Sequence, residues 1–513
     1  MAKLNVNGRI IDTLAGESLL GALQREGVRG VDAPCGGNGV CGKCLVRVTG
    51  TVTVNGETIE ADNAELRACR TVPVGDCTVS TNGADMVVLE GGTGELVTDG
   101  GEGLAVAVDI GTTTVAVYLY RMADGERLGV KSGVNFQRAY GADVISRISY
   151  ADRSAGGLEK MRDMIRGQID GYITELCEST GSERCRIKSV AVAGNTVMEH
   201  IFTGLSPSGI GVAPFKPESL FGYTAPAREL GMELDAEVYI TNAVAGYVGG
   251  DITAGILASG MYRSEKPCIF LDIGTNGEMA IGGKNGMLCC ATAAGPAFEG
   301  AELQYGMSGV EGAVSKVKFE GGELICSVIG GGKAAGICGS GYIDALAAML
   351  DMGAMDETGR LLDLDEAEET ALKYLDEDED GNIRFKLADG VYITQADVRK
   401  LQLAKAAIRA GLDLLLADTG TKEDDVETMF LAGGFGNFID CVSAGKIGLL
   451  PASLVKKTLA VGNAAGAGAS MAALSGGARR LLDEITASCR YSELSEHKGF
   501  SDAFMEAMTF EEI

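Results

Sequence analysis

The chain has 513 residues, which at about 150 residues per domain predicts three or four folding units. Its composition is 46% hydrophobic and 22% charged, which is typical of a globular protein, and its 75 glycines predict many tight turns and close backbone approaches to ligands. The formal net charge of −27 disfavours proteins that bind nucleic acid or an anionic membrane through a basic surface.

The first residues, MAKLNVNGRI, lack the apolar region of a signal peptide, and no stretch approaches about 18 uninterrupted apolar residues. We therefore expect a cytoplasmic protein that has neither nucleic acid nor membrane as a partner. In that compartment the 14 cysteines are expected as thiols or metal ligands, with few disulfides.

The N-terminal segment has the element order of a β-grasp ferredoxin. Two strands, 3–5 and 9–12, flank an Asn7-Gly8 hairpin signal. Residues 17–25 follow with leucines at helical spacing, and 45–48 alternate as a strand does. A small α+β domain is therefore predicted at this end.

Four cysteines lie in this segment, in PCGGNGVCGKC and LRAC, with the spacing C-x5-C-x2-C-x24-C. Plant-type ferredoxins hold a [2Fe–2S] cluster with C-x4-C-x2-C and a later cysteine, so one residue is added in the first gap. The intervening glycines let backbone N–H groups turn toward the cluster sulfurs. A four-cysteine zinc site is disfavoured because only one C-x2-C pair is present. The predicted cluster ligands are Cys35, Cys41, Cys44 and Cys69, and Cys77 is expected to be a buried thiol.

A Gly-rich segment, EGGTGELVTDGGEG at 90–103, predicts a flexible linker. It precedes LAVAVDIGTTTVAVYLY, in which an apolar strand ends at Asp109 and a Gly-Thr-Thr-Thr turn leads into a second strand. The same pattern recurs later as CIFLDIGTNGEMAI, around Asp272. A repeat of this size indicates two duplicated domains.

The chemistry of these turns fits a phosphate ligand. Backbone N–H groups and threonine hydroxyls suit phosphate oxygens, and the aspartates suit Mg²⁺ held through waters. A third segment, FLAGGFGNF, places Gly433 and Gly434 after a strand, where adenosine can lie against the backbone. Neither G-x4-G-K-[ST] nor G-x-G-x-x-G follows a strand, so a P-loop or Rossmann site is excluded.

Other segments leave alternatives open. Loops 193–196 and 241–243 follow strands and face the same cleft, while 330–341 precedes a helix at 342–350. Each is either a nucleotide contact or a structural turn, and the last is also a surface for a partner. His200 is expected to be packed or hydrogen-bonded. The acidic stretch 356–380 is expected to be a solvated insert.

The two DIGT turns and the late strand-Gly-Gly resemble the actin-like ATPase superfamily, in which two RNase-H-like lobes clamp ATP. The resemblance implies catalytic roles for Asp109 and Asp272, with Asp272 the better candidate to orient the attacking water and Glu278 and Glu299 weaker ones. It implies nucleotide binding by Asp109, Gly111, Thr112, Thr113, Asp272, Gly274, Thr275, Asn276, Gly433 and Gly434.

The whole arrangement resembles the reductive activators of corrinoid proteins. It implies a β-grasp ferredoxin followed by an α/β two-lobed actin-like ATPase, and one-electron reduction of Co(II) to Co(I) driven by ATP, with a [2Fe–2S] cluster and Mg²⁺. Implied partners are a corrinoid protein of a methyltransferase system, an upstream electron donor and a second copy in a homodimer. The expected units are 1–87 ferredoxin, 88–103 linker, 104–262 first lobe, 263–490 second lobe and 491–513 tail.

Two alternatives stay open. One is an ATP-driven electron donor to another low-potential metalloenzyme, such as the activases of 2-hydroxyacyl-CoA dehydratases, although those lack a ferredoxin domain. The other is a redox-sensing switch of the actin or heat-shock type. A small-molecule kinase fits less well because no sugar-binding insert is recognisable.

Overall fold

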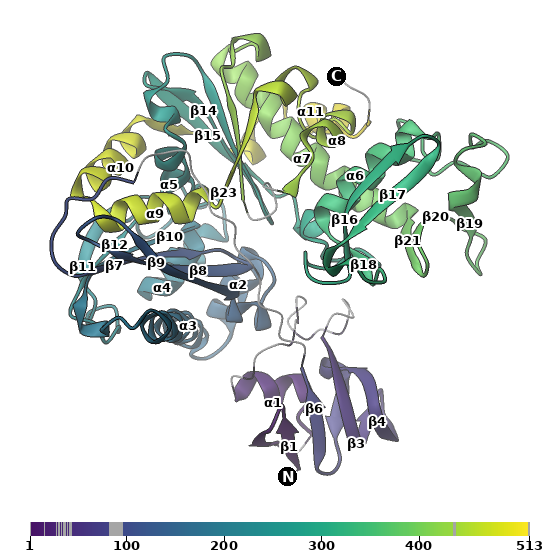
Figure 1. Ribbon diagram of the computed structural model, residues 1–513, viewed down its shortest axis with the longest axis horizontal. Helices are drawn as coiled ribbons and strands as arrows, with labels where there is room; N and C mark the ends of the chain where they lie inside the picture. Colours follow the sequence, from purple (N-terminus) through teal and green to yellow (C-terminus); the bar gives the residue numbers. More distant parts are fainter. Residues whose placement is uncertain are drawn as a thin grey trace.

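The computed structural model describes residues 2–14, 16–26, 28, 31, 33, 37, 39, 44–81, 96–433 and 438–510. Figure 1 shows a small N-terminal domain below a larger two-lobed body. The predicted cluster cysteines Cys35 and Cys41, and much of the predicted linker, lie outside the described residues.

The N-terminal domain is a mixed sheet in the order β2-β1-β6-β3-β4, with β5 paired to β3, and helix α1 packs on it. Asn7 and Gly8 form the predicted hairpin turn at φ 49° and 92°. The core between the sheet and α1 includes Leu4, Leu23 and Val48. The bounds are β1 Lys3–Val6, β2 Arg9–Asp12, α1 Leu19–Arg25, β3 Leu45–Val54, β4 Glu57–Arg67, β5 Thr71–Pro73 and β6 Cys77–Ser80.

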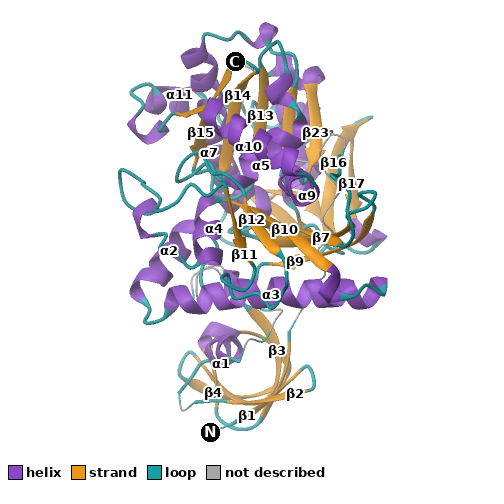
Figure 2. Cartoon of the chain, turned by 90° about the vertical axis from the view of Figure 1, so that its left-hand side faces the viewer, coloured by secondary structure: helices purple, strands orange, loops and turns teal. Residues whose placement is uncertain are grey.

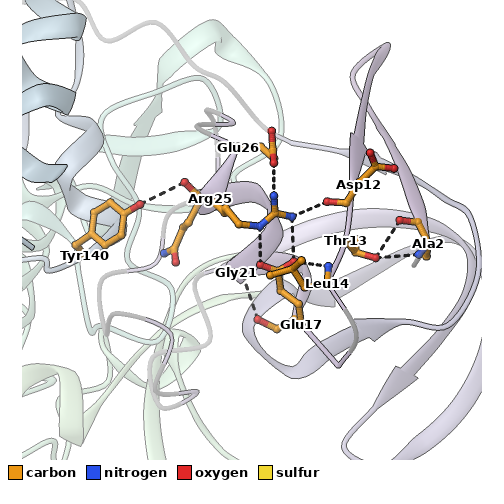
Figure 3. Close-up of polar contacts among 11 residues, drawn as sticks. Ala2, Asp12, Thr13, Leu14, Glu17, Gly21, Arg25, Glu26 and Tyr140 are labelled. Atoms are coloured by element: carbon orange, nitrogen blue, oxygen red, sulfur yellow. Dashed lines mark hydrogen bonds and ion pairs between the residues drawn. The ribbon is translucent and has the colours of Figure 1, made fainter. Parts of the chain in front are cut away.

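Helix α1 begins where Ser18 caps it, since the Ser18 side chain accepts the Gly21 N–H at 3.1 Å. Arg25, at its end, pairs with Glu17 at 3.1 Å and donates to the Asp12 carbonyl at 2.5 Å (Figure 3). The same guanidinium holds the pKa of Glu17 below its usual range. These bonds fix the helix against the end of β2.

The first lobe is a six-stranded sheet in the order β11-β12-β10-β7-β8-β9. The central strands β7, β10 and β12 are parallel, so their carboxyl ends meet at one edge. The bounds are β7 Leu104–Ile110, β8 Thr114–Arg121, β9 Arg127–Val134, α2 Val144–Arg153, α3 Gly157–Thr180, β10 Ile187–Gly194, α4 Thr196–Thr203, β11 Tyr223–Pro226, β12 Glu237–Ile240 and α5 Gly250–Ser259.

The second lobe repeats this topology in the order β23-β22-β13-β14-β15-β24. Strands β13, β14, β15, β22 and β23 correspond to β7, β8, β9, β10 and β12, with the same parallel and antiparallel pairs, as the sequence repeat predicts. The bounds are β13 Cys268–Ile273, β14 Gly277–Gly283, β15 Gly286–Thr292, α7 Gln395–Thr419, β22 Met429–Ala432, α8 Cys441–Lys446, β23 Thr458–Gly462, α9 Ala464–Leu474, α10 Gly476–Ser488, β24 Cys489–Tyr491 and α11 Phe500–Glu506.

An insertion in the second lobe carries two small sheets, at the right of Figure 1. It includes the acidic stretch, which is largely exposed as predicted. The bounds are β16 Ala313–Glu320, β17 Glu323–Val328, β18 Gly336–Ile337, α6 Gly339–Asp351, β19 Leu375–Glu377, β20 Ile383–Ala388 and β21 Val391–Thr394.

Helices α5 and α9 lie between the two sheets (Figure 2) and join the lobes in one core that includes Tyr118 and Phe270. Glycines permit the close packing: a Cβ on Gly468 would lie 2.1 Å from the Ala254 carbonyl oxygen. Within the described ranges, no helix has both the length and the apolar character needed to cross a membrane.

Candidate functional site

Each of the two repeated turns is closed by a backbone hydrogen bond from its glycine, although the bond spans three residues in the first turn and two in the second. In the first, the Gly111 N–H donates to the Thr114 carbonyl at 2.9 Å, and in the second, the Gly274 N–H donates to the Asn276 carbonyl at 2.9 Å. A Cβ on Gly111 would lie 2.8 Å from the Thr114 oxygen, so this tight turn requires glycine.

Asp109 ends the first strand and is held by an amide from the far end of the chain. The Asn463 Nδ2 donates to Asp109 Oδ2 at 2.7 Å, and Asn463 also caps α9. Burial raises the pKa of Asp109 to about 6, and the Asn463 hydrogen bond opposes that rise. The sequence prediction did not include Asn463, although an Asn before a helix is a capping signal.

Asp272 occupies the equivalent place in the second lobe, against the backbone at Gly433. A Cβ on Gly433 would lie 2.6 Å from Asp272 Oδ1, so the φ of 97° and the contact both require glycine here. Burial and the nearby charge of Asp109 raise the pKa of Asp272 to about 7. Gly434 lies outside the described residues.

Two further carboxylates join this pair. Asp251 lies in the first turn of α5, and burial, then Asp272 and Asp109, raise its pKa to about 8. Glu278 lies opposite Asp272 in the β13–β14 register, and burial with the charges of Asp251 and Asp272 raises its pKa. The sequence prediction missed Asp251, although Gly-Gly-Asp at a helix start was its signal.

These shifts share a cause: several carboxylates lose water and repel one another. A divalent cation would relieve the repulsion. Among the described residues, no three His, Cys, Asp or Glu side chains lie close enough together to hold a metal ion directly. The donor set therefore fits Mg²⁺ that keeps its water ligands, as it prefers.

Glu299 bridges the two turns. Its Oε2 accepts from Thr113 Oγ1 at 2.7 Å, and its Oε1 accepts from Thr275 Oγ1 at 2.7 Å. The structure thus brings together threonines from both predicted phosphate loops, through a side chain that the sequence ranked only as a minor candidate.

The loop at 193–196 supports the first turn, because Asn195 Nδ2 donates to Thr112 Oγ1 at 3.0 Å. His200 is buried, and its Nδ1 lies 2.7 Å from the Thr196 carbonyl oxygen, so the expectation of a packed histidine is confirmed. The loop at 330–341 packs on β16: a Cβ on Gly341 would lie 2.2 Å from the Val314 oxygen.

In the N-terminal domain, Cys44 and Cys69 meet although far apart in the chain: the Cys69 N–H donates to Cys44 Sγ at 3.5 Å. Burial raises the pKa of the Cys44 thiol to about 11. Amide-to-sulfur bonds around thiolates suit an iron–sulfur cluster. Cys77 is a buried thiol, as predicted, and donates to the Gly75 carbonyl at 3.2 Å.

The N-terminal domain contacts the first lobe through the end of α1. Gln24 Nε2 donates to the Ala139 carbonyl at 2.5 Å. The Tyr140 hydroxyl donates to the Gln24 carbonyl at 3.3 Å, and Figure 3 shows this hydroxyl directed toward α1. The predicted cluster domain therefore touches the lobe that carries the first turn.

Comparison with known proteins gives matches along the whole chain. Residues 3–74 match the family "2Fe-2S iron-sulfur cluster binding domain", 104–264 match "RACo middle region" and 266–513 match "C-terminal domain of RACo the ASKHA domain". The corrinoid activation enzyme RamQ of Eubacterium limosum is 36% identical over 414 residues, 78% of this chain and 69% of that protein.

Two further relatives agree. The Co(II) methylated amine-specific corrinoid protein reductase of Methanosarcina barkeri is 25% identical over 392 residues, 70% of this chain and 67% of that protein. A solved reductive activator for corrinoid, iron-sulfur protein superposes with a TM-score of 0.72 at 31% identity, covering 99% of this chain and 98% of that one. The predicted ferredoxin and actin-like ATPase folds are thereby confirmed, and the chain belongs to the family of ATP-dependent reductive activators of corrinoid proteins, with a [2Fe–2S] domain joined to an ASKHA ATPase.

Proposed function

We propose that this protein reduces the Co(II) form of a corrinoid protein to Co(I) by one electron and so returns a methyltransferase system to its active state. The observation that carries the proposal is that a cysteine-bearing ferredoxin domain contacts the lobe whose first turn follows Asp109, one of a group of buried carboxylates that repel one another. The [2Fe–2S] cluster, when bound by Cys35, Cys41, Cys44 and Cys69, supplies the electron.

The residues of the two turns and the nearby carboxylates have different roles in binding Mg-ATP. Asp109, Asp251 and Asp272 bind the waters of Mg²⁺, while Thr112, Thr113 and Thr275 with the amides near Gly111, Gly274 and Asn276 bind phosphate oxygens. Gly433 and Gly434 leave room for adenosine. Asp272 orients the attacking water, because, within the described residues, no hydrogen bond to its carboxylate is found, whereas Asp109 is fixed by Asn463.

We propose a route from the nucleotide to the ferredoxin domain. Arg147 is fully buried and donates to the Thr112 carbonyl and, at 3.1 Å, to the Gly141 carbonyl. The neighbouring Tyr140 holds Gln24 of α1, and α1 packs against the turn that carries Cys69. A shift of the first turn on ATP binding therefore moves the cluster domain.

ATP is needed because the electron goes uphill. For one electron, each ~59 mV of unfavourable potential costs a factor of ten in equilibrium. Nucleotide binding that differs between two arrangements of the lobes provides free energy of a comparable order.

The partners beyond the corrinoid protein follow from the family resemblance: an upstream reductase that feeds the cluster, and a second copy in a homodimer.

We propose a cytoplasmic location because the chemistry needs ATP and the twelve cysteines of the described part are all free. We keep the unit boundaries 1–87, 88–103, 104–262, 263–490 and 491–513 as proposals.

The test mixes the reconstituted full chain, a Co(II) corrinoid protein, a chemical reductant and Mg-ATP, and follows the Co(II) spectrum. Loss of Co(II) only when both ATP and reductant are present is expected. Cys44→Ser should abolish it, while Cys77→Ser, a thiol of the same domain outside the cluster set, should not. ATP-independent reduction at the same rate would contradict the proposal.

A further inference from the structure

A tightly packed backbone holds the Glu299 carboxylate between the two turns. Glu299 ends a short 3-10 turn, Pro296–Glu299, whose Phe298 is fully buried. Gly300 follows at φ 73°, where a Cβ would lie 2.5 Å from the Met307 oxygen. The position of Glu299 is therefore set by packing on both sides.

Both carboxylate oxygens are engaged, each by a hydroxyl from a different lobe: Thr113 and Thr275, at 2.7 Å each. Bonds from hydroxyls to an ionised carboxylate are roughly twice as strong as bonds between neutral groups. A Cβ on Gly274 would lie 4.0 Å from Glu299 Oε1, so the carboxylate reaches the second turn itself.

The Glu299 carboxylate is an anion that accepts one hydroxyl hydrogen bond from each of the two turns. A phosphoryl group, which is also an anion with several acceptor oxygens, suits the same two donors. Two anions cannot share these donors, because like charges at such distances repel strongly. We propose that Glu299 occupies the place of the terminal phosphate in the nucleotide-free protein and that the γ-phosphate of ATP displaces it. This inference rests on the proposed ATP-binding function.

Glu299 then distinguishes triphosphate from diphosphate. ATP replaces both threonine bonds of the carboxylate with bonds to γ-phosphate oxygens, whereas ADP has no group to replace them and leaves Glu299 in place. The position of Glu299 thus depends on the γ-phosphate. Such a difference in contacts is what allows ATP and ADP to favour different conformations of the protein.

Within the second lobe, close backbone contacts connect Glu299 to the start of α6. Gly300 and Gly306 pack so tightly that a Cβ on Gly306 would lie 2.0 Å from the Gly300 oxygen. Beyond them, the Met307 N–H donates to the Ile337 carbonyl at 3.0 Å and the Ile337 N–H donates to the Tyr305 carbonyl at 2.8 Å. Ile337 lies just before α6, so release of Glu299 reaches the start of that helix.

The experiment measures Kd for Mg-AMPPNP and for Mg-ADP by calorimetry on the reconstituted full chain. Glu299→Ala removes the competing anion, and we expect AMPPNP to bind about tenfold more tightly, equivalent to about 1.4 kcal/mol, with Kd for ADP within about twofold. Glu299→Gln keeps the shape and one acceptor without the charge, so its effect should be intermediate. Glu320→Ala, an exposed glutamate of the same lobe, is the control.

Hydrogen exchange gives a second readout. In the wild type, AMPPNP but not ADP should change protection at the Met307 and Ile337 amides, and in Glu299→Ala the difference between the two nucleotides should shrink. Equal protection changes with both nucleotides in the wild type would overturn the inference.

Two binding outcomes would also overturn it. Unchanged or weaker AMPPNP binding with a lower kcat would assign Glu299 to water positioning, and equal tightening of ADP and AMPPNP would mean general relief of negative charge. If the wild type binds no adenine nucleotide at all, the proposed function itself fails. If it binds AMPPNP and Glu299→Ala binds it equally well, only the role of Glu299 fails.

Discussion

The two D-x-G-T turns of this protein have almost the same sequence but different surroundings. Asp109 accepts a hydrogen bond from Asn463, and its pKa is about 6. Asp272 faces the bare backbone of Gly433, and burial together with the charge of Asp109 raises its pKa to about 7. The strands are duplicated, but the groups that pack on each aspartate come from other parts of the chain.

A repeated motif therefore need not have a repeated role. A carboxylate fixed by an amide suits a structural task, such as orienting the waters of Mg²⁺. A carboxylate that accepts no such bond from the described part of the chain suits the task of orienting a reacting water.

The largest effect is expected from Asp272→Ala. If Asp272 orients the water, ATP turnover should fall by at least about a hundredfold, the size of loss seen when one preorganised polar group is removed from an active site. The visible spectrum of the cluster should be unchanged, because Asp272 belongs to a separate unit. A loss of that spectrum would contradict independent folding of the ferredoxin domain, and Asp235→Ala, an exposed aspartate, serves as control.

Asn463→Ala removes the amide that donates a hydrogen bond to Asp109. A hydrogen bond to a charged group is worth about 1.5–3 kcal/mol, so kcat/KM should fall by roughly ten- to a hundredfold. Because the amide opposes the rise in the pKa of Asp109, its removal should move the acid limb of the pH–rate profile to higher pH. An unmoved acid limb would show that Asp109 does not control the profile.

Tyr140→Phe tests the link between the first lobe and the cluster domain. Loss of one neutral hydrogen bond, worth about 0.5–1.5 kcal/mol, should reduce cobalt reduced per ATP hydrolysed by about two- to tenfold. ATP hydrolysis alone should be unaffected, since the hydroxyl lies outside the cleft and contacts Gln24. Parallel loss of both activities would instead indicate damage to the lobe.

The smallest effect is on stability. The pKa values of Asp109, Asp272 and Asp251 are raised to about 6, 7 and 8, so the folded cleft holds protons that the unfolded chain has released. Stability of the nucleotide-free protein should therefore fall as pH rises from about 4 toward 8. Asp251→Asn should raise Tm by a few degrees at pH 8, at about 2–4 °C per kcal/mol, and by less at pH 5.

Mg-AMPPNP should remove most of this difference, because the cation compensates the repulsion among the carboxylates. Thermal unfolding with and without the nucleotide at the two pH values checks the prediction. If Asp251→Asn gave the same change at both pH values, the raised pKa of Asp251 would not be its cause.

Much of the candidate site was predictable because it is local. The hairpin at Asn7-Gly8, the strands that end at Asp109 and Asp272, and the glycines of both turns are set by neighbours within a few residues. Asp251 and Asn463 were missed because each joins the cleft from a helix start that is remote in the chain from the aspartate it affects.

The sequence by its own pattern predicted which chemistry the chain carries, from four spaced cysteines for a [2Fe–2S] cluster and two duplicated turns for phosphate. Hydrophobic periodicity, turn-forming residues and the spacing of the cysteines are enough for this prediction, because each acts between residues that are close in the chain. Tertiary structure decided how the parts differ: that Asn463 fixes Asp109, that Glu299 joins Thr113 to Thr275, and that Tyr140 meets Gln24. These contacts join residues from separate elements, so only the packing of the lobes brings their side chains within bonding distance and removes the water between them.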